Sequence, residues 1–277
     1  MDYNTTIVSS YYKIPSKKNH EFYISPVKRF LGHIQTPIVF FTTEDLVEEL
    51  QSYRSGLPIT FVILPLDEFV AFQRYGKQFW INQCAMDVEK YHTPELCALW
   101  YEKRFFVKRA IEKNPFQSNY FIWCDAGCAR KDDWIPYLKT FGQNTRTFSQ
   151  THLQFQQIYP MHTSFGTTIQ TYAANTKHQP VETKHPYPLF LFMFPHMSIA
   201  GAIIGGTPDS WSWYYDAYDW MVFQYVHHKI CVNMDQNIMH SLSCNFPDKI
   251  ECINFEIQPY ALQCPDRWFF FLMHYST

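Results

Sequence analysis

The chain has 277 residues, of which 47% are hydrophobic and 19% aromatic, and its formal net charge is -2. This composition is typical of a globular protein with a sizeable core and excludes an intrinsically disordered chain. The small net charge argues against a dedicated nucleic-acid-binding protein, because such proteins present a broad cationic surface. A nucleotide pocket remains compatible with this charge, since it needs only a few local cations.

Eight cysteines are scattered along the chain, and no two of them form a CxxC pair. A structural zinc site needs paired ligands at short spacing, and Cys124 with Cys128 has no matching second pair. We therefore expect reduced thiols, as in the cytoplasm. The first residues contain neither a basic nor an apolar segment, so we expect no secretory signal. The expected location is cytoplasmic, or the cytoplasm of a host if the protein is viral.

Three apolar runs in the first quarter of the chain predict β-strands. They are rich in β-branched and aromatic residues, are bounded by Pro, Ser or Thr, and cover residues 5–10, 37–43 and 58–65. Such continuous runs are typical of strands buried on both faces. The acidic pair Glu44-Asp45 after the second run predicts the start of a helix. This alternation favours an α/β fold with a largely parallel sheet.

The clearest predicted helix begins at Thr93-Pro94-Glu95. Threonine suits the N-cap, proline the first helical position, and glutamate the positive end of the helix dipole. The helix ends at Asn114, because Pro115 disfavours a helical residue before it. Seven apolar side chains fall on one face at helical spacing: Leu96, Leu99, Trp100, Phe106, Val107, Ala110 and Ile111.

Lys103 lies in the middle of this apolar face, whereas the other cations of the helix point elsewhere, namely Arg104, Lys108, Arg109 and Lys113. A lysine on an apolar face is costly unless its ammonium group finds an anion. Two interpretations stay open. Either the long side chain extends to the surface, or it reaches a carboxylate or a ligand phosphate near the end of the next strand.

That next strand, residues 120–124, runs directly into Asp125 in the sequence NYFIWCDAGCAR. In open α/β sheets, ligands bind outside the carboxyl ends of the strands. Asp125 is therefore in a position where chemistry is expected. An aspartate before small residues such as Ala126 and Gly127 is, however, also common in turns.

Residues 142–188 are rich in Gln, Thr, Asn, His and Pro and show no sustained period. We expect a long irregular excursion there, with histidines that lack metal-ligand spacing. The uncharged stretch 188–206 is long enough to cross a membrane. However, Pro195 divides it and three glycines weaken its second half as a helix, so two buried strands joined by a turn are expected instead.

A helix over 208–228, a strand over 229–233 and a short helix ending near Asn245 are predicted for the following part of the chain. Asp235 falls at the junction between that strand and the short helix, where it is either a plain helix cap or a functional carboxylate. No G-x-S-x-G, Walker or G-x-G-x-x-G motif occurs in the sequence, which argues against an enzyme of the α/β hydrolase type.

Six sequence blocks together resemble the HtrL/YibB family (also called WlaTC/HtrL), which is associated with glycosyltransferases. In chain order they read TIVSSYY, VFFTTED, ELCALWYEKRFFVKRAIEKNPFQSNYFIWCDAGCAR, AGAIIGG, VNMDQNIM and DRWFFFLMHYS, and the third is the most specific. Its helix, buried strand, acidic residue and small turn also resemble the centre of a GT-A glycosyltransferase. There, a strand-end carboxylate motif binds a divalent metal and the diphosphate of a nucleotide sugar.

The resemblance implies one GT-A-like domain over residues 1–277, with a Rossmann-type mixed sheet flanked by helices. Residues 1–141 would form the nucleotide-sugar-binding half, 142–188 an irregular insertion, and 189–277 the acceptor-side half. The implied reaction moves a hexose from a nucleotide-diphosphate sugar to a hydroxyl group of a glycan, with Mn²⁺ or Mg²⁺ assisting the leaving group. The alternative is a catalytically inactive GT-A-like protein that binds carbohydrate or nucleotide. Neither a nucleic-acid partner nor a transmembrane segment is expected.

The resemblance also assigns the contacts to the donor substrate. They fall on residues near the ends of the predicted strands and on the long helix: Ser9, Ser10, Tyr11, Thr42, Thr43, Lys103, Asp125 and Gly127. Asp125 would bind the metal or the donor sugar, and Lys103 would approach the pyrophosphate or the Asp125 carboxylate. Arg130 would neutralise phosphate charge as the leaving group departs, which suits a guanidinium group.

On the acceptor side, the resemblance points to two pairs of neighbouring residues. Gly205 and Gly206 would let the backbone pass close to a sugar, where a side chain would intrude. Asp235, next to Gln236, would act as the base in an inverting transfer or as a stabilising carboxylate in a retaining one.

One position departs from the GT-A pattern. Many of these enzymes carry two acidic residues in a D-x-D metal motif, whereas Gly127 takes the third position here. Asp132 and Asp133 follow closely and are able to supply the second ligand, although they suit a cap of the next segment better. A single carboxylate with diphosphate oxygens and water also holds Mg²⁺ or Mn²⁺. Alternatively, Arg130 and Lys103 replace the metal.

Overall fold

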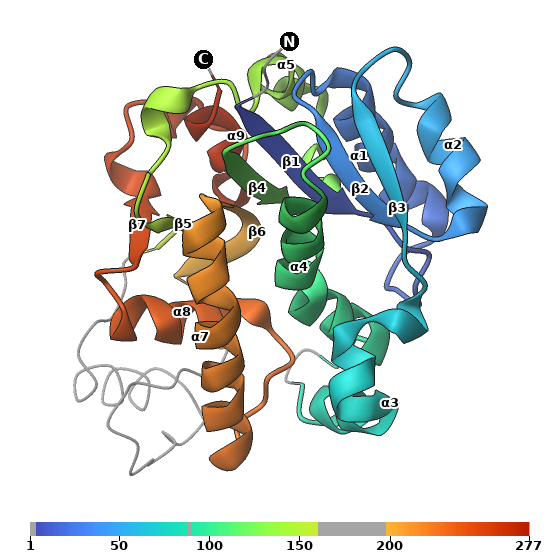
Figure 1. The fold of residues 1–277 in the computed structure, drawn as a ribbon, viewed down its shortest axis with the longest axis vertical. Coiled ribbons are helices and arrows are strands. Elements are labelled where there is room, and N and C mark those ends of the chain that lie inside the picture. Colours follow the sequence, from blue (N-terminus) through green and yellow to red (C-terminus); the bar gives the residue numbers. More distant parts are fainter. Residues whose placement is uncertain (1–3, 88–89, 160–197, 277) are drawn as a thin grey trace.

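The computed structural model of the protein describes residues 4–87, 90–159 and 198–276. Seven strands of this part form one mixed sheet in the order β3-β2-β1-β4-β6-β5-β7 (Figure 1). Four adjacent strands pair with one another in parallel: β1 (Thr5–Ser10), β2 (Ile38–Thr42), β3 (Ile59–Ile63) and β4 (Tyr120–Cys124). The other three are β6 (Ile199–Gly206), antiparallel to both β4 and β5, then β5 (Leu153–Gln157), and β7 (Ile250–Asn254), parallel to β5. The predicted mixed α/β sheet is confirmed.

Helices cover both faces of this sheet. One face packs against α3 (Val70–Ala85), α4 (Pro94–Lys113), α7 (Pro208–His227) and α8 (Asp235–Asn245). The other packs against α1 (His20–His33), α2 (Val47–Ser52), α5 (Ile135–Thr140) and α9 (Phe271–His274). Alternate residues of β4 enter the two cores, since Trp123 belongs to the first and Ile122 to the second. Burial on both faces explains the continuous apolar runs of β1, β2 and β4.

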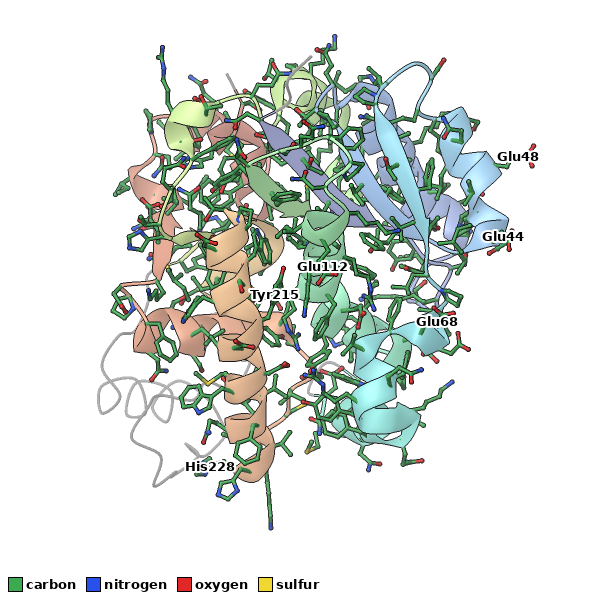
Figure 2. The ribbon with its side chains drawn as sticks, in the orientation of Figure 1. Glu44, Glu48, Glu68, Glu112, Tyr215 and His228 are labelled. Carbon is green, nitrogen blue, oxygen red and sulfur yellow. The ribbon has the colours of Figure 1, made fainter. Side chains whose placement is uncertain are left out.

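β3 departs from this pattern. Its side chains are mostly only partly buried, and Ile63 is 50% exposed. β3 is an edge strand with one neighbour, so the predicted burial on both faces is wrong for it. The helix start predicted nearby at Glu44-Asp45 is confirmed as a short 3-10 turn that leads into α2. Glu44 and Glu48 project away from the body of the molecule there (Figure 2).

α4 has the termini that the sequence predicts. The Thr93 side chain accepts a hydrogen bond from the backbone N–H of Leu96, and Pro94 occupies the first turn. The helix stops at Asn114, whose left-handed backbone (φ 32°) turns the chain toward β4. This short connection places the helix directly against the strand that follows it, so Lys103 and Asp125 belong to neighbouring elements.

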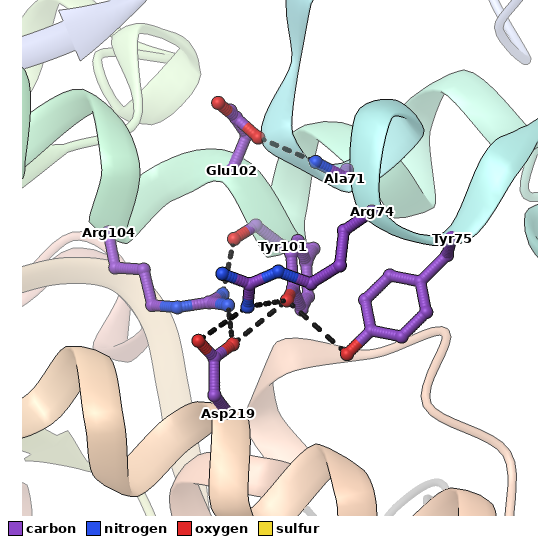
Figure 3. A network of polar contacts seen from close by, with 7 residues as sticks. All are labelled: Ala71, Arg74, Tyr75, Tyr101, Glu102, Arg104 and Asp219. Carbon is purple, nitrogen blue, oxygen red and sulfur yellow. Dashed lines mark hydrogen bonds and ion pairs between the residues drawn. The ribbon is translucent and has the colours of Figure 1, made fainter.

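The buried surface of α4 is broader than the predicted stripe. Arg104, expected to point away, is 2% exposed and forms an ion pair with Asp219 of α7 (Figure 3). Asp219 also pairs with Arg74 of α3 and accepts a hydrogen bond from the Tyr101 hydroxyl. The prediction for Arg104 is wrong because α4 is covered by α3 and α7 as well as by the sheet, so its flanks are buried too.

Two predictions for the second half are also wrong. Residues 142–188 were expected to be irregular throughout, but residues 153–157 form β5 inside the sheet. Its polar sequence is compatible with burial because Gln154 accepts hydrogen bonds from the hydroxyls of Tyr120 and Tyr275. The strand expected over 229–233 is instead irregular, and the backbone N–H of Val232 donates to the Gln83 side chain rather than to a sheet neighbour.

The other predicted elements of this half agree with the structure as far as it is described. α7 matches the helix over 208–228, and α8 ends at Asn245. β6 is the second of the two strands expected in 188–206, and the first lies outside the described residues. Within the described ranges, no helix has the length and apolar character needed to span a membrane.

Candidate functional site

The Lys103 side chain reaches carboxylates and not the surface. It is 8% exposed, and its Nζ lies 3.2 Å from Asp125 Oδ1 and 2.8 Å from Asp235 Oδ2. Nζ also donates a hydrogen bond to the carbonyl oxygen of Gly201, at 2.9 Å. Of the two interpretations left open by the sequence, the one in which Lys103 reaches a carboxylate near the end of the next strand is confirmed. Three segments far apart in the chain therefore meet at one ammonium group.

Asp125 follows the last residue of β4, as predicted. Its backbone N–H donates to the carbonyl of Ala202 on β6, which extends the pairing of the two strands by one residue. Its side chain makes no capping hydrogen bond to the short turn that follows. Instead, Oδ1 accepts a hydrogen bond from Trp123 Nε1 at 2.8 Å, and the carboxylate is 34% exposed. The backbone of Asp125 begins this turn, because its carbonyl accepts a hydrogen bond from the N–H of Cys128, while its side chain is a fixed carboxylate that remains open to solvent.

Asp235 is the first residue of α8, but it does not cap that helix. The N-cap position belongs to Met234, and no side chain forms a capping hydrogen bond there. The Asp235 carboxylate is 4% exposed and turns inward to Lys103. It therefore supplies the second carboxylate of the site, from an element remote in sequence from Asp125.

Gly201 makes this arrangement sterically possible and was missed at the sequence level. A Cβ atom at this position would lie 2.6 Å from Asp235 Oδ2, which is closer than any side chain tolerates. The glycine lies on β6 within the block AGAIIGG. This block was identified at the sequence level, but the functional role was assigned to its other two glycines, Gly205 and Gly206. The steric need for Gly201 arises from Asp235, whose approach no local pattern reveals.

The surroundings shift the pKa values of Lys103 and Asp125. Burial disfavours the ammonium, but the attraction of Asp125 and Asp235 outweighs it and raises the pKa of Lys103. Burial raises the pKa of Asp125; Lys103 opposes this rise and the negative charge of Asp235 adds to it. Lys103 is therefore held as the cation, while Asp125 is a carboxylate with an elevated proton affinity.

These residues form the floor of a cleft of about 860 Å³ at the carboxyl ends of β1 and β4. The segment after β1 and the first turns of α4 contribute its walls, including Tyr12 and Trp100. Eight of the residues predicted from the sequence line this cleft: Ser10, Tyr11, Lys103, Asp125, Gly127, Arg130, Asp235 and Gln236. The structure thus brings together residues from both predicted halves of the chain.

Three predicted donor contacts do not reach the cleft. Ser9 is fully buried, and its hydroxyl donates to the carbonyl of Cys124 at 2.6 Å. Thr42 is also fully buried and donates to the carbonyl of Tyr11 at 2.8 Å. Thr43 begins the turn after β2 and is absent from the cleft lining. The Ser9 and Thr42 side chains join neighbouring strand ends and do not line the cleft, so the prediction that they contact the donor is corrected.

Gly205 and Gly206 lie at the opposite end of the sheet from Asp125. Because β6 is antiparallel to β4, these glycines pair with Ile122 and Phe121. A Cβ at Gly205 would overlap the Tyr275 hydroxyl, and one at Gly206 would overlap the Ser210 hydroxyl. The absence of side chains at Gly205 and Gly206 allows Tyr275 and Ser210 to pack closely against the strand. The prediction that these glycines contact a sugar is therefore corrected.

The region after Asp125 does not supply a second acidic residue. Gly127 has open space where a Cβ would be, so nothing requires a glycine there. Asp132 is 78% exposed and accepts a hydrogen bond from Arg29 Nε at 2.6 Å. Neither Asp132 nor Asp133 lines the cleft. The D-x-D pattern is thus incomplete in space as well as in sequence.

The donor set does not fit a resident divalent metal ion. The Lys103 ammonium lies within hydrogen-bond distance of both carboxylates and occupies the place that a shared cation would take. Among the described residues, no group of three or more His, Cys, Asp or Glu side chains is arranged to hold a metal. Asp125 is the exposed carboxylate of the pair, so a metal would find one accessible protein ligand.

Among the described residues that line the cleft, cations outnumber carboxylates. Lys13, Lys18 and Arg130 line it in addition to Lys103, against Asp125 and Asp235. The Arg130 guanidinium carbon lies 4.8 Å above the centre of the Phe269 ring. Lys13 and Lys18 belong to the segment KIPSKKNH after β1. The basic residues of this segment could have indicated the cationic wall, but the sequence-based site prediction did not include them.

Aromatic side chains form a further part of the lining. Trp100 of α4 and Trp268 are partly buried and pack against Met234, next to Asp235. Gln236 follows Asp235 in the lining, and its Oε1 has no hydrogen-bond partner among the described residues. This wall combines flat apolar surfaces with a free polar group.

Residues 70–174 match the HtrL_YibB family, which is described as a bacterial protein of unknown function. The matched region contains α3, α4, β4 and Asp125, so it includes the block on which the resemblance mainly depends. The resemblance to this family is thereby confirmed over these residues. A search of curated proteins finds no match to the chain.

Proposed function

We propose that the protein is a glycosyltransferase that moves a hexose from a nucleotide-diphosphate sugar to a hydroxyl group of a glycan. The observation that carries this proposal is the meeting of Lys103, Asp125 and Asp235 on the floor of a cleft at the carboxyl ends of the strands. Ligands of open α/β sheets bind at such edges. The cationic lining suits a diphosphate, and the tryptophans suit the apolar faces of a sugar.

The donor occupies the part of the cleft between the segment after β1 and Arg130. Its diphosphate contacts Lys13, Lys18 and Arg130, which line that region. During transfer, the bond between the anomeric carbon and the diphosphate oxygen breaks, and its electron pair leaves with the diphosphate. Cationic side chains placed against this oxygen lower the barrier, because negative charge develops there in the transition state.

Asp125 is the carboxylate that faces the reacting groups. It is 34% exposed in the cleft, whereas Asp235 is 4% exposed and engaged by Lys103. Asp125, with its raised pKa, accepts the proton of the acceptor hydroxyl as the oxygen bonds to the anomeric carbon. Asp235, assigned as the base at the sequence level, is better suited to hold Lys103 in place. The glycan lies beside Trp100 and Trp268.

The test is a screen of nucleotide sugars for donor turnover, with and without Mn²⁺, on the parent protein and on Asp125→Asn. We expect turnover by the parent and a loss of about 10²–10⁴-fold in the variant, the range typical for removal of a general base. Asp132→Asn is the matched control, because Asp132 is an exposed carboxylate outside the cleft. Its turnover should equal that of the parent.

The same screen separates the alternatives. Binding of a nucleotide sugar without turnover under any metal condition would favour an inactive binding protein. Absence of both binding and turnover would contradict a role in nucleotide-sugar chemistry. Equal losses in Asp125→Asn and Asp132→Asn would show that the effect does not arise in the cleft.

A further inference from the structure

The contacts of Lys103 saturate its ammonium group. An ammonium has three N–H donors and no acceptor. Nζ has acceptors in Asp125, Asp235 and the carbonyl of Gly201, at 3.3, 2.8 and 2.9 Å. All three donors are therefore engaged within the protein. Lys103 has no donor left for a substrate phosphate, and its charge acts on the two carboxylates.

The two carboxylates require a cation between them. Carboxylates that share a site with low solvent exposure repel each other, and the pair is stable in its charged form only beside a positive charge. In many sites that charge is a divalent metal ion. Here Lys103 supplies it from α4, so a metal ion placed between Asp125 and Asp235 would have to displace the ammonium or lie against it.

The surroundings fix the ammonium in this position. Trp123 Nε1 donates to Asp125 Oδ1, and the Lys103 Nζ lies 5.9 Å from the centre of the Trp123 ring. Gly201 leaves room for Asp235 to approach. The Lys103 side chain is therefore held by contacts from three elements: Asp235 at the start of α8, Asp125 after β4, and Gly201 on β6.

The rest of the cleft provides charge for a diphosphate without a metal. Lys13, Lys18 and Arg130 line the cleft beyond the buried group. Among the described residues of the lining, four cationic side chains against two carboxylates leave a surplus of positive charge, and Lys13 also lies 3.9 Å from the Glu49 carboxylate outside the lining. That surplus complements the charge of a bound diphosphate, a task that a divalent ion performs where acidic residues dominate the lining.

We propose that Lys103 takes the place of the divalent cation in this site, so that the protein binds a diphosphate and acts on it without a metal ion. Catalysis without a metal ion rests on the proposed glycosyl transfer. The replacement of a divalent cation by Lys103 does not depend on that function, because it concerns only which cation the two carboxylates bind.

The first experiment measures Mn²⁺ binding to the full chain by electron paramagnetic resonance, without any nucleotide. The parent should bind Mn²⁺ no more tightly than its Asp125→Asn variant. Lys103→Ala should bind Mn²⁺ at least about tenfold more tightly than the parent, because the like charge between the carboxylates is gone. The double variant Lys103→Ala/Asp235→Asn should lose this gain.

Lys108→Ala is the matched control, since Lys108 is an exposed lysine on the same helix. It should bind Mn²⁺ as the parent does. Parent binding of Mn²⁺ that is lost in Asp125→Asn would overturn the proposal. A folded Lys103→Ala variant that gains no Mn²⁺ affinity would also overturn it.

The second experiment remains decisive if Lys103→Ala does not fold. Inorganic pyrophosphate serves as the diphosphate probe, and its stabilisation of the parent against heat is measured in excess EDTA. We expect EDTA to leave this stabilisation unchanged and Arg130→Ala to reduce it. A stabilisation that appears only with added Mn²⁺ would overturn the proposal. A failure to turn over any nucleotide sugar would refute the proposed function while leaving both binding results interpretable.

Discussion

Lys103 and Arg104 are neighbours in the sequence, and both are buried cations of α4, yet their surroundings differ. Lys103 faces Asp125 and Asp235 at the end of the sheet, where Asp125 is 34% exposed in a cleft. Arg104 faces Asp219 between α3, α4 and α7 (Figure 3). The two ion pairs therefore differ in one respect that matters for ligand binding: Asp125 lines the cleft, whereas Asp219 does not.

The aromatic environment sharpens the contrast. The Arg104 guanidinium lies 3.8 Å from the Tyr101 ring centre and 4.3 Å from that of Tyr218, so planar groups pack around a planar cation. Lys103 instead directs a compact point charge at oxygen atoms from three segments. The first arrangement joins helices, and the second holds two carboxylates in the lining of the cleft.

The largest effect is expected for Lys103→Met. The change leaves Asp125 and Asp235 close together without a cation, so the free energy of unfolding should fall by about 3 kcal/mol, the lower end for a broken buried pair. Nucleotide-sugar turnover should be lost as well, since the carboxylates are no longer held. Urea unfolding and a turnover assay check this. The surface variant Lys108→Met should match the parent in both, and an unchanged Lys103→Met variant would contradict the role of the pair.

Arg104→Met should affect stability but not ligand binding. Asp219 keeps its contact with Arg74 and is 29% exposed, so we expect the free energy of unfolding to fall by a smaller amount, about 2 kcal/mol. Binding of pyrophosphate at a temperature where the variant is folded should equal that of the parent. A specific loss of binding with full stability would remove the distinction between the two cations.

The sequence predicted the parts of this comparison that depend on local pattern. Lys103 was identified because it interrupts an apolar period, and Asp125 because it follows a buried strand. Arg104 was misjudged because its burial depends on α7, which follows much later in the chain. The pairing of Asp235 with Lys103 also required the tertiary fold. Local periodicity defines one helix face, and it does not report how many neighbours the helix has.

The glycines show the same limit. Gly201, Gly205 and Gly206 belong to one strand, and their sequence context does not separate the one that faces Asp235 from the two that face Tyr275 and Ser210. β5 was missed because its glutamines look like loop residues until their partners are known. Steric and hydrogen-bonding demands from distant segments therefore account for these errors.

Gly201→Ala should have an intermediate effect that again depends on the carboxylate pair. The new methyl group would force Asp235 away from Lys103, so the free energy of unfolding should fall by about 2 kcal/mol, as for other overpacked sites. Turnover should fall with it. Gly127→Ala is the control, because open space surrounds that position, and its stability should stay within about 0.5 kcal/mol of the parent. Equal effects of the two changes would refute the steric argument.

The smallest effect is expected in the pH dependence of stability, where the two ion pairs should differ in sign. Arg104 and the hydrogen bond from Arg74 outweigh burial and lower the pKa of Asp219. The unfolded chain then binds more protons than the folded one, so this contribution is lost as the pH falls below about 4. Burial raises the pKa of Asp125. Its contribution is present at low pH and is lost as the pH rises above about 4, through the raised pKa of the folded state.

Urea unfolding of the parent, Asp219→Asn and Asp125→Asn between acid and neutral pH separates the two contributions. Relative to the parent, Asp219→Asn should flatten the rise of stability with pH, whereas Asp125→Asn should make that rise steeper. The reason is that each asparagine removes one titration, and the two titrations have opposite slopes. Slopes that change in the same direction would show that the cleft carboxylate is held no differently from the one between the helices.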